Sequence, residues 1–221
     1  KSETLVTGEI AQFIYIDTSI LVCQSEIPPQ SPDLKGGDCL DSGSKEIYQE
    51  QLSWLKKQLA KNSRWKIVIG HFPIFSAGNH GDSVELINDI LPLFHEFKVD
   101  LYFCGHDHTL QHLRQKVKLI SFRKKKTQSI KKLISNKIIG VDFVVSGGGG
   151  YKVDKEIRDH PQLIFGQLAN GFAIFSLNSN SLKVSFYDHD SNNLKPFYTL
   201  RRINKSKNND CSFSNEILIS E

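Results

Sequence analysis

The hydrophobic positions along the chain fall into short apolar runs separated by amphipathic or polar segments. The runs at Gln12–Asp17, Trp65–Gly70 and Asp100–Cys104 are rich in β-branched and aromatic residues and predict buried strands. A shorter strand is expected at Ile20–Cys23. Over residues 45–60, every third or fourth residue is Tyr or Leu, which predicts an amphipathic helix. Strands that alternate with helices in this way predict βαβ layering.

Further along, the pattern predicts a second helix and more strands. Asp82 and Glu85 have the spacing of a capping box at a helix start, and Pro92 is expected to kink or split the helix that follows. Residues 140–145 predict a strand that ends in Ser146 and four glycines, a run that suggests close backbone approach. Residues 172–177 and 182–187 predict a hairpin.

Composition and charge indicate a soluble globular chain with one basic segment. The chain has 221 residues, of which 39% are hydrophobic, and a net charge of +4. Arg114–Lys137 holds ten Lys/Arg and no Asp/Glu, so the remainder has 18 basic against 24 acidic residues, or −6. Phe122 is the only ring in this segment, which favours a solvated insertion over a nucleic-acid surface. Residues 204–221 are expected to form a polar tail, and no apolar stretch is long enough for a membrane span.

The cysteines do not suggest a zinc ribbon or a thioredoxin-type site, because none of the four forms a Cys-x-x-Cys pair. Cys23 and Cys39 flank a loop rich in Pro and Gly over residues 24–44, and they could close it as a disulfide in an exported protein. We expect this loop to be exposed and sensitive to proteases.

Three histidines follow two of the predicted strands. His71 comes directly after the strand that ends at Gly70, and His106 and His108 come after the strand that ends at Cys104. Open α/β sheets collect their ligand-binding loops at the carboxyl ends of parallel strands, so the three imidazoles are expected to converge. The sequence therefore predicts metal ligation by His71, His106 and His108.

Several motifs in family order resemble the purple acid phosphatases of the metallophosphoesterase superfamily, most closely the small tartrate-resistant kind. The matching stretches are Ile16-Asp-Thr18, Gln51-Leu-Ser-Trp-Leu-Lys-Lys-Gln-Leu59, Gly70-His-Phe-Pro-Ile-Phe75 with His80 nine residues after His71, Tyr102-Phe-Cys-Gly-His-Asp-His-Thr-Leu-Gln111 and Val144-Val-Ser-Gly-Gly148. Gly-His-x-His is shared by the whole superfamily. The Gln-Leu-Ser-Trp-Leu match and the spacing to His80 indicate this branch.

The resemblance implies a layered α/β/β/α sandwich, of which residues 1–203 are the C-terminal part, with a basic insertion at about residues 114–137. His71 and His106 would bind the divalent metal (Fe or Zn, with Mn possible), and His108 the ferric ion, of an Fe(III)–M(II) pair. His80 would face the substrate as the catalytic residue. The implied reaction is acid hydrolysis of phosphate monoesters, on small molecules or phosphoproteins, in a secreted or lysosomal enzyme.

The chain departs from the family in its metal ligands. A ferric ion and a metal bridge require oxygen ligands, and in the family the Gly-Asp, Gly-Asp-x-x-Tyr and Gly-Asn-His motifs that supply them come, in order, before the stretches that this chain matches. The resemblance is therefore to the C-terminal half alone, and this chain by itself is expected to be inactive. The alternatives are another metallophosphoesterase, such as a phosphodiesterase or nucleotidase, or a non-catalytic remnant that binds at most one metal.

Overall fold

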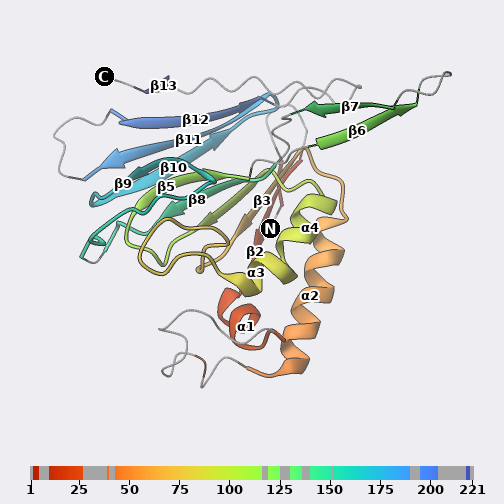
Figure 1. Cartoon of the computed structure of the whole chain (residues 1–221). Coiled ribbons are helices and arrows are strands. Elements are labelled where there is room, and N and C mark those ends of the chain that lie inside the picture. The colour runs from red at the N-terminus through yellow and green to blue at the C-terminus, as the bar shows by residue number, and fades with distance from the viewer. Residues whose placement is uncertain are drawn as a thin grey trace.

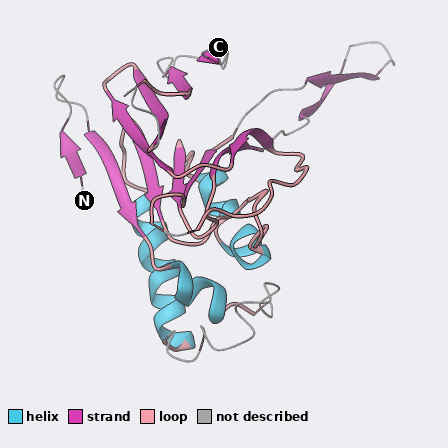
Figure 2. Ribbon diagram, turned by 90° about the vertical axis from the view of Figure 1, so that its left-hand side faces the viewer, coloured by secondary structure: helices cyan, strands magenta, loops and turns pink. Residues whose placement is uncertain are grey.

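The fold consists of two stacked β-sheets with helices against the outer face of the larger sheet (Figures 1 and 2). The computed structural model describes residues 2–4, 10–26, 39, 43–115, 119–124, 130–135, 140–150, 152–189, 195–203 and 218–219. Within these residues, the helices lie on one side of the two sheets. The described part of the chain therefore contains three of the four expected layers, namely one layer of helices and two sheets. In the described part of the chain, none of the helices is long and apolar enough to cross a membrane.

The larger sheet has seven strands in the order β1-β2-β3-β4-β8-β5-β9. Its centre is parallel, because β2, β3, β4 and β8 pair in the same direction, whereas β1, β5 and β9 are antiparallel to their neighbours. The strands are β1 (Ser2–Thr4), β2 (Ile10–Tyr15), β3 (Trp65–Ile69), β4 (Leu101–Cys104), β5 (Leu110–Arg114), β8 (Asp142–Ser146) and β9 (Leu163–Gln167). The predicted strands β2, β3, β4 and β8 are confirmed, and β5 and β9 were not predicted.

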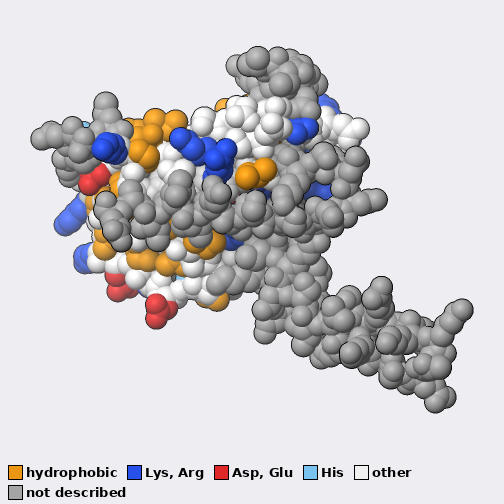
Figure 3. All heavy atoms as spheres, turned by 90° about the horizontal axis from the view of Figure 1, so that it is seen from above, with side chains coloured by type: hydrophobic (Ala, Val, Ile, Leu, Met, Phe, Trp, Pro, Cys, Tyr) orange, Lys and Arg blue, Asp and Glu red, His pale blue; other side chains and the backbone are white. Residues whose placement is uncertain are grey.

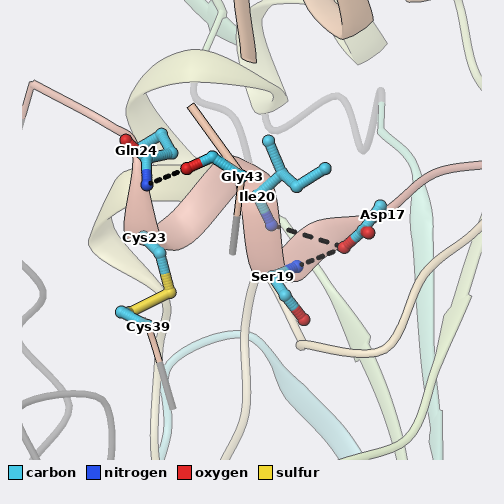
Figure 4. Close-up of a disulfide and its surroundings, with 7 residues drawn as sticks. All are labelled: Asp17, Ser19, Ile20, Cys23, Gln24, Cys39 and Gly43. Carbon is cyan, nitrogen blue, oxygen red and sulfur yellow. Dashed lines mark hydrogen bonds between the residues drawn. A yellow bond between two sulfur atoms is a disulfide. The ribbon is translucent and has the colours of Figure 1, made fainter. Parts of the chain in front are cut away.

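The helices are α1 (Thr18–Cys23), α2 (Lys45–Leu59), α3 (Val84–Asp89) and α4 (Leu91–Glu96). The expected strand at Ile20–Cys23 is wrong: Asp17 caps a helix there by accepting the N–H groups of Ser19 and Ile20, and periodicity alone cannot classify so short an apolar run (Figure 4). The helix at residues 45–60 is confirmed.

The helix predicted after Asp82 divides at Pro92, as expected, with α4 beginning one residue before this proline. The predicted capping box is wrong, because α3 starts after Ser83, whose side chain makes no capping hydrogen bond. Asp82 instead accepts the N–H of Ser76 at 2.9 Å and contacts His160 at 3.1 Å. This carboxylate therefore joins two loops.

A disulfide between Cys23 and Cys39 joins the end of α1 to the following loop (Figure 4). Gln24 donates to the carbonyl of Gly43 at 3.1 Å, and Ser25 donates to Asp89 at 2.8 Å. The possible Cys23–Cys39 bridge is thus confirmed. The expectation of an exposed, protease-sensitive loop concerns residues 27–38 and 40–42, which lie outside the described residues.

The smaller sheet has four strands in the order β10-β11-β12-β13. They are β10 (Gly171–Leu177), β11 (Ser181–Asp188), β12 (Tyr198–Ile203) and β13 (Leu218–Ile219). The predicted hairpin is confirmed as β10 and β11, and Asn178 closes its turn by accepting the N–H groups of Asn180 and Ser181 at 2.9 Å each. Leu182, Val184, Phe186 and Leu200 are fully buried between the two sheets.

The basic segment contains a separate two-stranded sheet, β6 (Leu119–Lys124) and β7 (Ile130–Ser135), which extends away from the body (Figures 1 and 2). Arg114 is an exception to the expectation that the segment is solvated. It belongs to β5, is 5% exposed and pairs with Asp142. A buried anion compensates this cation, and sequence order alone does not reveal that partner.

Asp142 is the centre of a buried ionic cluster between the two sheets. Its carboxylate contacts His112 at 2.9 Å and the Arg114 guanidinium in the larger sheet, and Arg202 of β12 at 3.1 Å. His112 also contacts the Tyr198 hydroxyl at 2.6 Å. Burial alone would raise the pKa of Asp142, but the His112 hydrogen bond and the two arginines hold it well below its ordinary value of 3.8.

We predict that Asp142→Asn lowers the free energy of unfolding by about 3–5 kcal/mol at neutral pH, because it leaves buried cations without their anion. A carboxylate with a depressed pKa stabilises the fold above its unfolded pKa, and this contribution falls as the pH drops below that value. The difference between wild type and variant should therefore shrink below about pH 4.

Urea unfolding at several pH values measures this difference. Asp159→Asn is the matched control, because Asp159 is exposed and its substitution should change the free energy of unfolding by less than about 0.5 kcal/mol. A difference between wild type and Asp142→Asn that stays constant down to about pH 2 would contradict the assignment.

Candidate functional site

The site lies where β3 and β4 end at the same edge of the larger sheet. Ile69 of β3 is in register with Phe103 of β4, and the pairing continues beyond both strands. The Gly70 N–H donates to the Phe103 carbonyl, and the Gly105 N–H donates to the His71 carbonyl, both at 3.1 Å. The parallel register therefore places the turn that carries His71 beside the turn that carries His106.

The turn from Gly105 to Thr109 is tight. The N–H of Asp107 donates to the Gly105 carbonyl at 2.9 Å, and the N–H of Thr109 donates to the Asp107 carbonyl at 2.8 Å. His106 has a φ of 68°, in the left-handed region that few side chains other than Asn, Asp and His adopt. Such conformations cost about 1–3 kcal/mol and persist where the surroundings fix them.

Thr18 fixes the turn after β3. Its hydroxyl, which is buried, accepts the N–H of His71 at 3.0 Å and the N–H of Phe72 at 2.9 Å. Tyr102 of β4 donates to the Phe72 carbonyl at 2.6 Å. The Ile16-Asp-Thr18 motif thus serves two purposes, because Asp17 begins α1 while Thr18 holds the backbone of a predicted metal ligand.

The predicted histidines converge. The ring centroids of His71 and His106 are 5.2 Å apart, and those of His80 and His106 are 4.2 Å apart. Burial and the nearby charge of His108 lower the pKa of His71, which favours the neutral imidazole. His108 contacts the Lys152 carbonyl through Nδ1 at 3.1 Å. A proton on Nδ1 satisfies that carbonyl and leaves the Nε2 lone pair for a ligand.

Asp107 connects His80 to this turn. The carboxylate of Asp107 is fully buried, and it accepts the backbone N–H of His80 at 3.0 Å while the His80 ring lies 4.0 Å away. Burial raises the pKa of the Asp107 carboxyl, and the hydrogen bonds from Ser76 and His80 oppose that rise. In the sequence, this aspartate occupies the variable position of Gly-His-x-His, which gives no sign of its partners.

Asp107 belongs to a buried polar network that ties the His80 loop to β5. Ser76 donates to Asp107 and accepts from Gln111 at 3.0 Å. Gln111 also accepts the N–H of Ala77 at 2.8 Å and donates to Thr109 at 2.7 Å. Sequence reasoning missed Ser76, Thr109 and Gln111. The available signal was the occurrence of polar residues beside apolar ones, although the contacts that join Ser76 to Asp107 and Gln111 span 31 and 35 residues.

The side chains fit only part of a metal centre. Three imidazoles are brought to one edge of the sheet, and nitrogen donors of this kind suit a zinc-like divalent ion. Within the described residues, however, no three His, Cys, Asp or Glu side chains are arranged to hold a metal ion. The donors present do not suit a ferric ion, which prefers anionic oxygen. We therefore assign no reaction step to an iron centre built from this chain alone.

We predict that Gly147→Ala displaces the His106–His108 turn, because a methyl group at Gly147 would lie 1.9 Å from the carbonyl oxygen of Asp107. The loss in unfolding free energy should be about 1–3 kcal/mol, the usual cost of overpacking. Gly150→Ala is the matched control, since a methyl group there has no atom within 4 Å. Unfolding curves and the imidazole NMR signals of both variants would check this, and equal effects would contradict it.

Comparisons with known proteins find phosphoesterases among the relatives of this chain. The calcineurin-like phosphoesterase family matches residues 6–110. Purple acid phosphatase 4 of Arabidopsis thaliana is 32% identical over 205 residues, which cover 90% of this chain and 53% of the relative. Tartrate-resistant acid phosphatase type 5 of Rattus norvegicus is 28% identical, over 67% of this chain and 41% of the relative. The chain thus spans about half the length of the curated relatives it matches.

Solved structures show the same fold. GAP50, the anchor in the inner membrane complex of Plasmodium, aligns with a TM-score of 0.66 at 23% identity, over 94% of this chain and 54% of that chain. Purple acid phosphatase PPD1 from yellow lupin aligns with a TM-score of 0.52 at 20% identity, over 69% of this chain and 28% of that chain. At these identities, the likeness shows the fold alone. Residues 6–110 thus match the calcineurin-like phosphoesterase family, and purple acid phosphatases are among the homologues of the chain.

Proposed function

We propose that this chain is the histidine-bearing part of an acid phosphatase that hydrolyses phosphate monoesters, on small molecules or phosphoproteins, with a dinuclear metal centre. The observation that carries the proposal is the convergence of His71, His80 and His106 at the ends of β3 and β4. In this assignment, His71 and His106 bind the divalent metal, and His108 binds the ferric ion. The oxygen ligands come from polypeptide other than the described residues.

The bound metals would supply a water molecule acidified to hydroxide and positive charge to neutralise the phosphoryl oxygens. The chain's own residues orient the donors. Thr18 and the β3–β4 hydrogen bonds hold the backbone at His71. The Lys152 carbonyl sets the His108 ring so that Nε2 faces away from the loop's backbone.

His80 is the proposed catalytic residue. Its half-buried ring lies beside His106, and its backbone is held by the Asp107 carboxylate. From this place the imidazole could donate a hydrogen bond to a phosphoryl oxygen, or deliver a proton to the leaving alkoxide. The first role needs only an N–H on the ring, whereas the second needs an imidazolium proton that the ring can release. In this proposal the enzyme acts in a secreted or lysosomal location.

We expect the chain to bind one zinc-like ion through its imidazoles. Isothermal titration with Zn²⁺ should show that His71→Ala and His106→Ala each weaken binding at least about tenfold, because each removes a nitrogen donor to the divalent metal. His95→Ala is the control, since His95 is exposed on α4 and should leave the affinity unchanged. Zinc affinity that neither of the two substitutions lowers would refute the proposed ligands of the divalent metal.

We also expect the 221-residue chain alone, loaded with iron and zinc, not to hydrolyse a chromogenic phosphate at about pH 5. It should show no visible charge-transfer band, because the imidazoles offer iron(III) no phenolate. Turnover that chelators stop and that His108→Ala abolishes would show that the chain itself completes the site. Inactivity that persists when the polypeptide with the family's Gly-Asp and Gly-Asn-His motifs is co-expressed would favour a non-catalytic metal-binding role.

A further inference from the structure

One apolar row on the larger sheet is covered at one end and open at the other. Tyr15, Ile69, Phe103 and Val144 are lateral neighbours on β2, β3, β4 and β8, and they face the smaller sheet. Val144 is 0% exposed, Ile69 and Phe103 are partly buried, and Tyr15 is 60% exposed. Exposure therefore rises across the sheet from β8 toward β2.

Exposure also rises along the strands toward the histidine site. On the face of β2 that carries Tyr15, Ala11 is fully buried and Phe13 is partly buried. On β3, Trp65 and Ile67 are fully buried, whereas Ile69 is only partly buried. The opposite face of β2 shows no such trend, since Ile14, which faces the helices, is 2% exposed. The uncovered area thus belongs to the space between the sheets.

The smaller sheet ends at β10, above this area. Phe175 of β10 contacts both Phe13 and Phe103, with ring centroids 5.8 Å apart in each pair. Within the described residues, no strand pairs with the other side of β10. Phe172 and Ile174, on the outer face of β10, are 43% and 50% exposed, and Figure 3 shows hydrophobic side chains at the surface on this side of the molecule.

The hydrogen-bond pattern shows which groups β10 presents at that edge. His189 donates to Asn170, and Asn178 donates to Ser181, so the even-numbered residues of β10 bond to β11. The odd-numbered residues point the other way. Gly171 donates to Gly148 and Ala173 to the Ser146 hydroxyl, but Phe175 and Leu177 have no such backbone partner in the described part of the chain.

We propose that the open edge of β10 is a docking site for an extended peptide strand whose alternate side chains are apolar. The backbone of that strand would pair with Phe175 and Leu177, and its inward side chains would cover Tyr15, Ile69 and Phe103. An open edge above exposed apolar residues is a surface that proteins normally cover. The inference rests on this geometry and not on the proposed phosphatase activity.

A single strand suits this space better than a second folded copy. The larger sheet continues beyond Phe103 to β3, β2 and β1, so it lies beneath the open edge. The space beside β10 is therefore one strand layer above β2 and β3. A second copy would have to bring its own larger sheet into the same position, where β1 and β2 already lie.

Leu177 allows a test that separates the backbone from the side chain. Its N–H points away from β11, so Leu177→Pro removes a donor at the open edge while it keeps the ladder to β11. Leu177→Ala is the matched control, because it loses the same side chain but retains the N–H. The probe is a synthetic peptide of about nine residues with alternating valine and threonine and a lysine at each end.

We expect the peptide to slow amide exchange at Phe175 and Leu177 at least about tenfold in the wild type, since both N–H groups become hydrogen-bonded. It should also slow nitration of Tyr15, with Tyr15→Phe identifying that signal. Leu177→Pro should weaken peptide binding at least about fivefold relative to Leu177→Ala, the effect of one lost hydrogen bond.

Three results would overturn the proposal. The first is peptide binding that leaves the exchange of Phe175 and Leu177 and the nitration of Tyr15 unchanged. The second is the absence of binding at millimolar peptide. The third is a concentration-dependent dimer in sedimentation that Leu177→Pro abolishes and Leu177→Ala retains, because the occupant would then be a second copy. Loss of phosphatase activity would not bear on any of these results.

Discussion

The parallel pairing of β3 with β4 is the constraint on which the candidate site depends. Its register extends into the turns through the bonds Gly70 to Phe103 and Gly105 to His71. A shift of one residue would turn the inward side chains of either strand to the opposite face. It would also separate His71 from His106. The pairing of these strands therefore fixes the position of the polar site, and at this register Ile67 and Leu101 are fully buried neighbours.

The sequence was sufficient for this part of the fold because the signals are local. β2, β3 and β4 are short runs of β-branched and aromatic residues, and α2 repeats its apolar residues at helical spacing. Prediction from neighbouring residues was wrong where the same short sequence suits two different structures. Ile20–Cys23 suits a strand by composition, yet the Asp17 cap makes it a helix. Asp82 has capping spacing, yet it bonds to Ser76 and His160 instead.

The supporting polar networks could not be derived from the sequence, because their members are distant in the chain. Asp107 is 31 residues from Ser76, and Asp142 is 60 residues from Arg202. A charged residue in an apolar strand, such as Asp142 within Val141–Val145, indicates that a buried partner exists but not which one. His112 and Arg114 gave no separate signal. The convergence of the histidines was predictable for the opposite reason, since both turns follow neighbouring parallel strands.

Two features at the carboxyl ends of β3 and β4 indicate that the described residues leave both the metal site and the packing incomplete there. The imidazoles of His71, His106 and His108 provide nitrogen donors, and the charge of two bound metals would require carboxylates as well. Ile69 and Phe103, which lie two and three residues before His71 and His106, are only partly covered on their inner faces. An added strand would bury apolar side chains, and any residue following it could approach the site. The partly covered apolar side chains and the need for carboxylate ligands thus both favour additional polypeptide at the carboxyl ends of β3 and β4, although the two arguments rest on different residues.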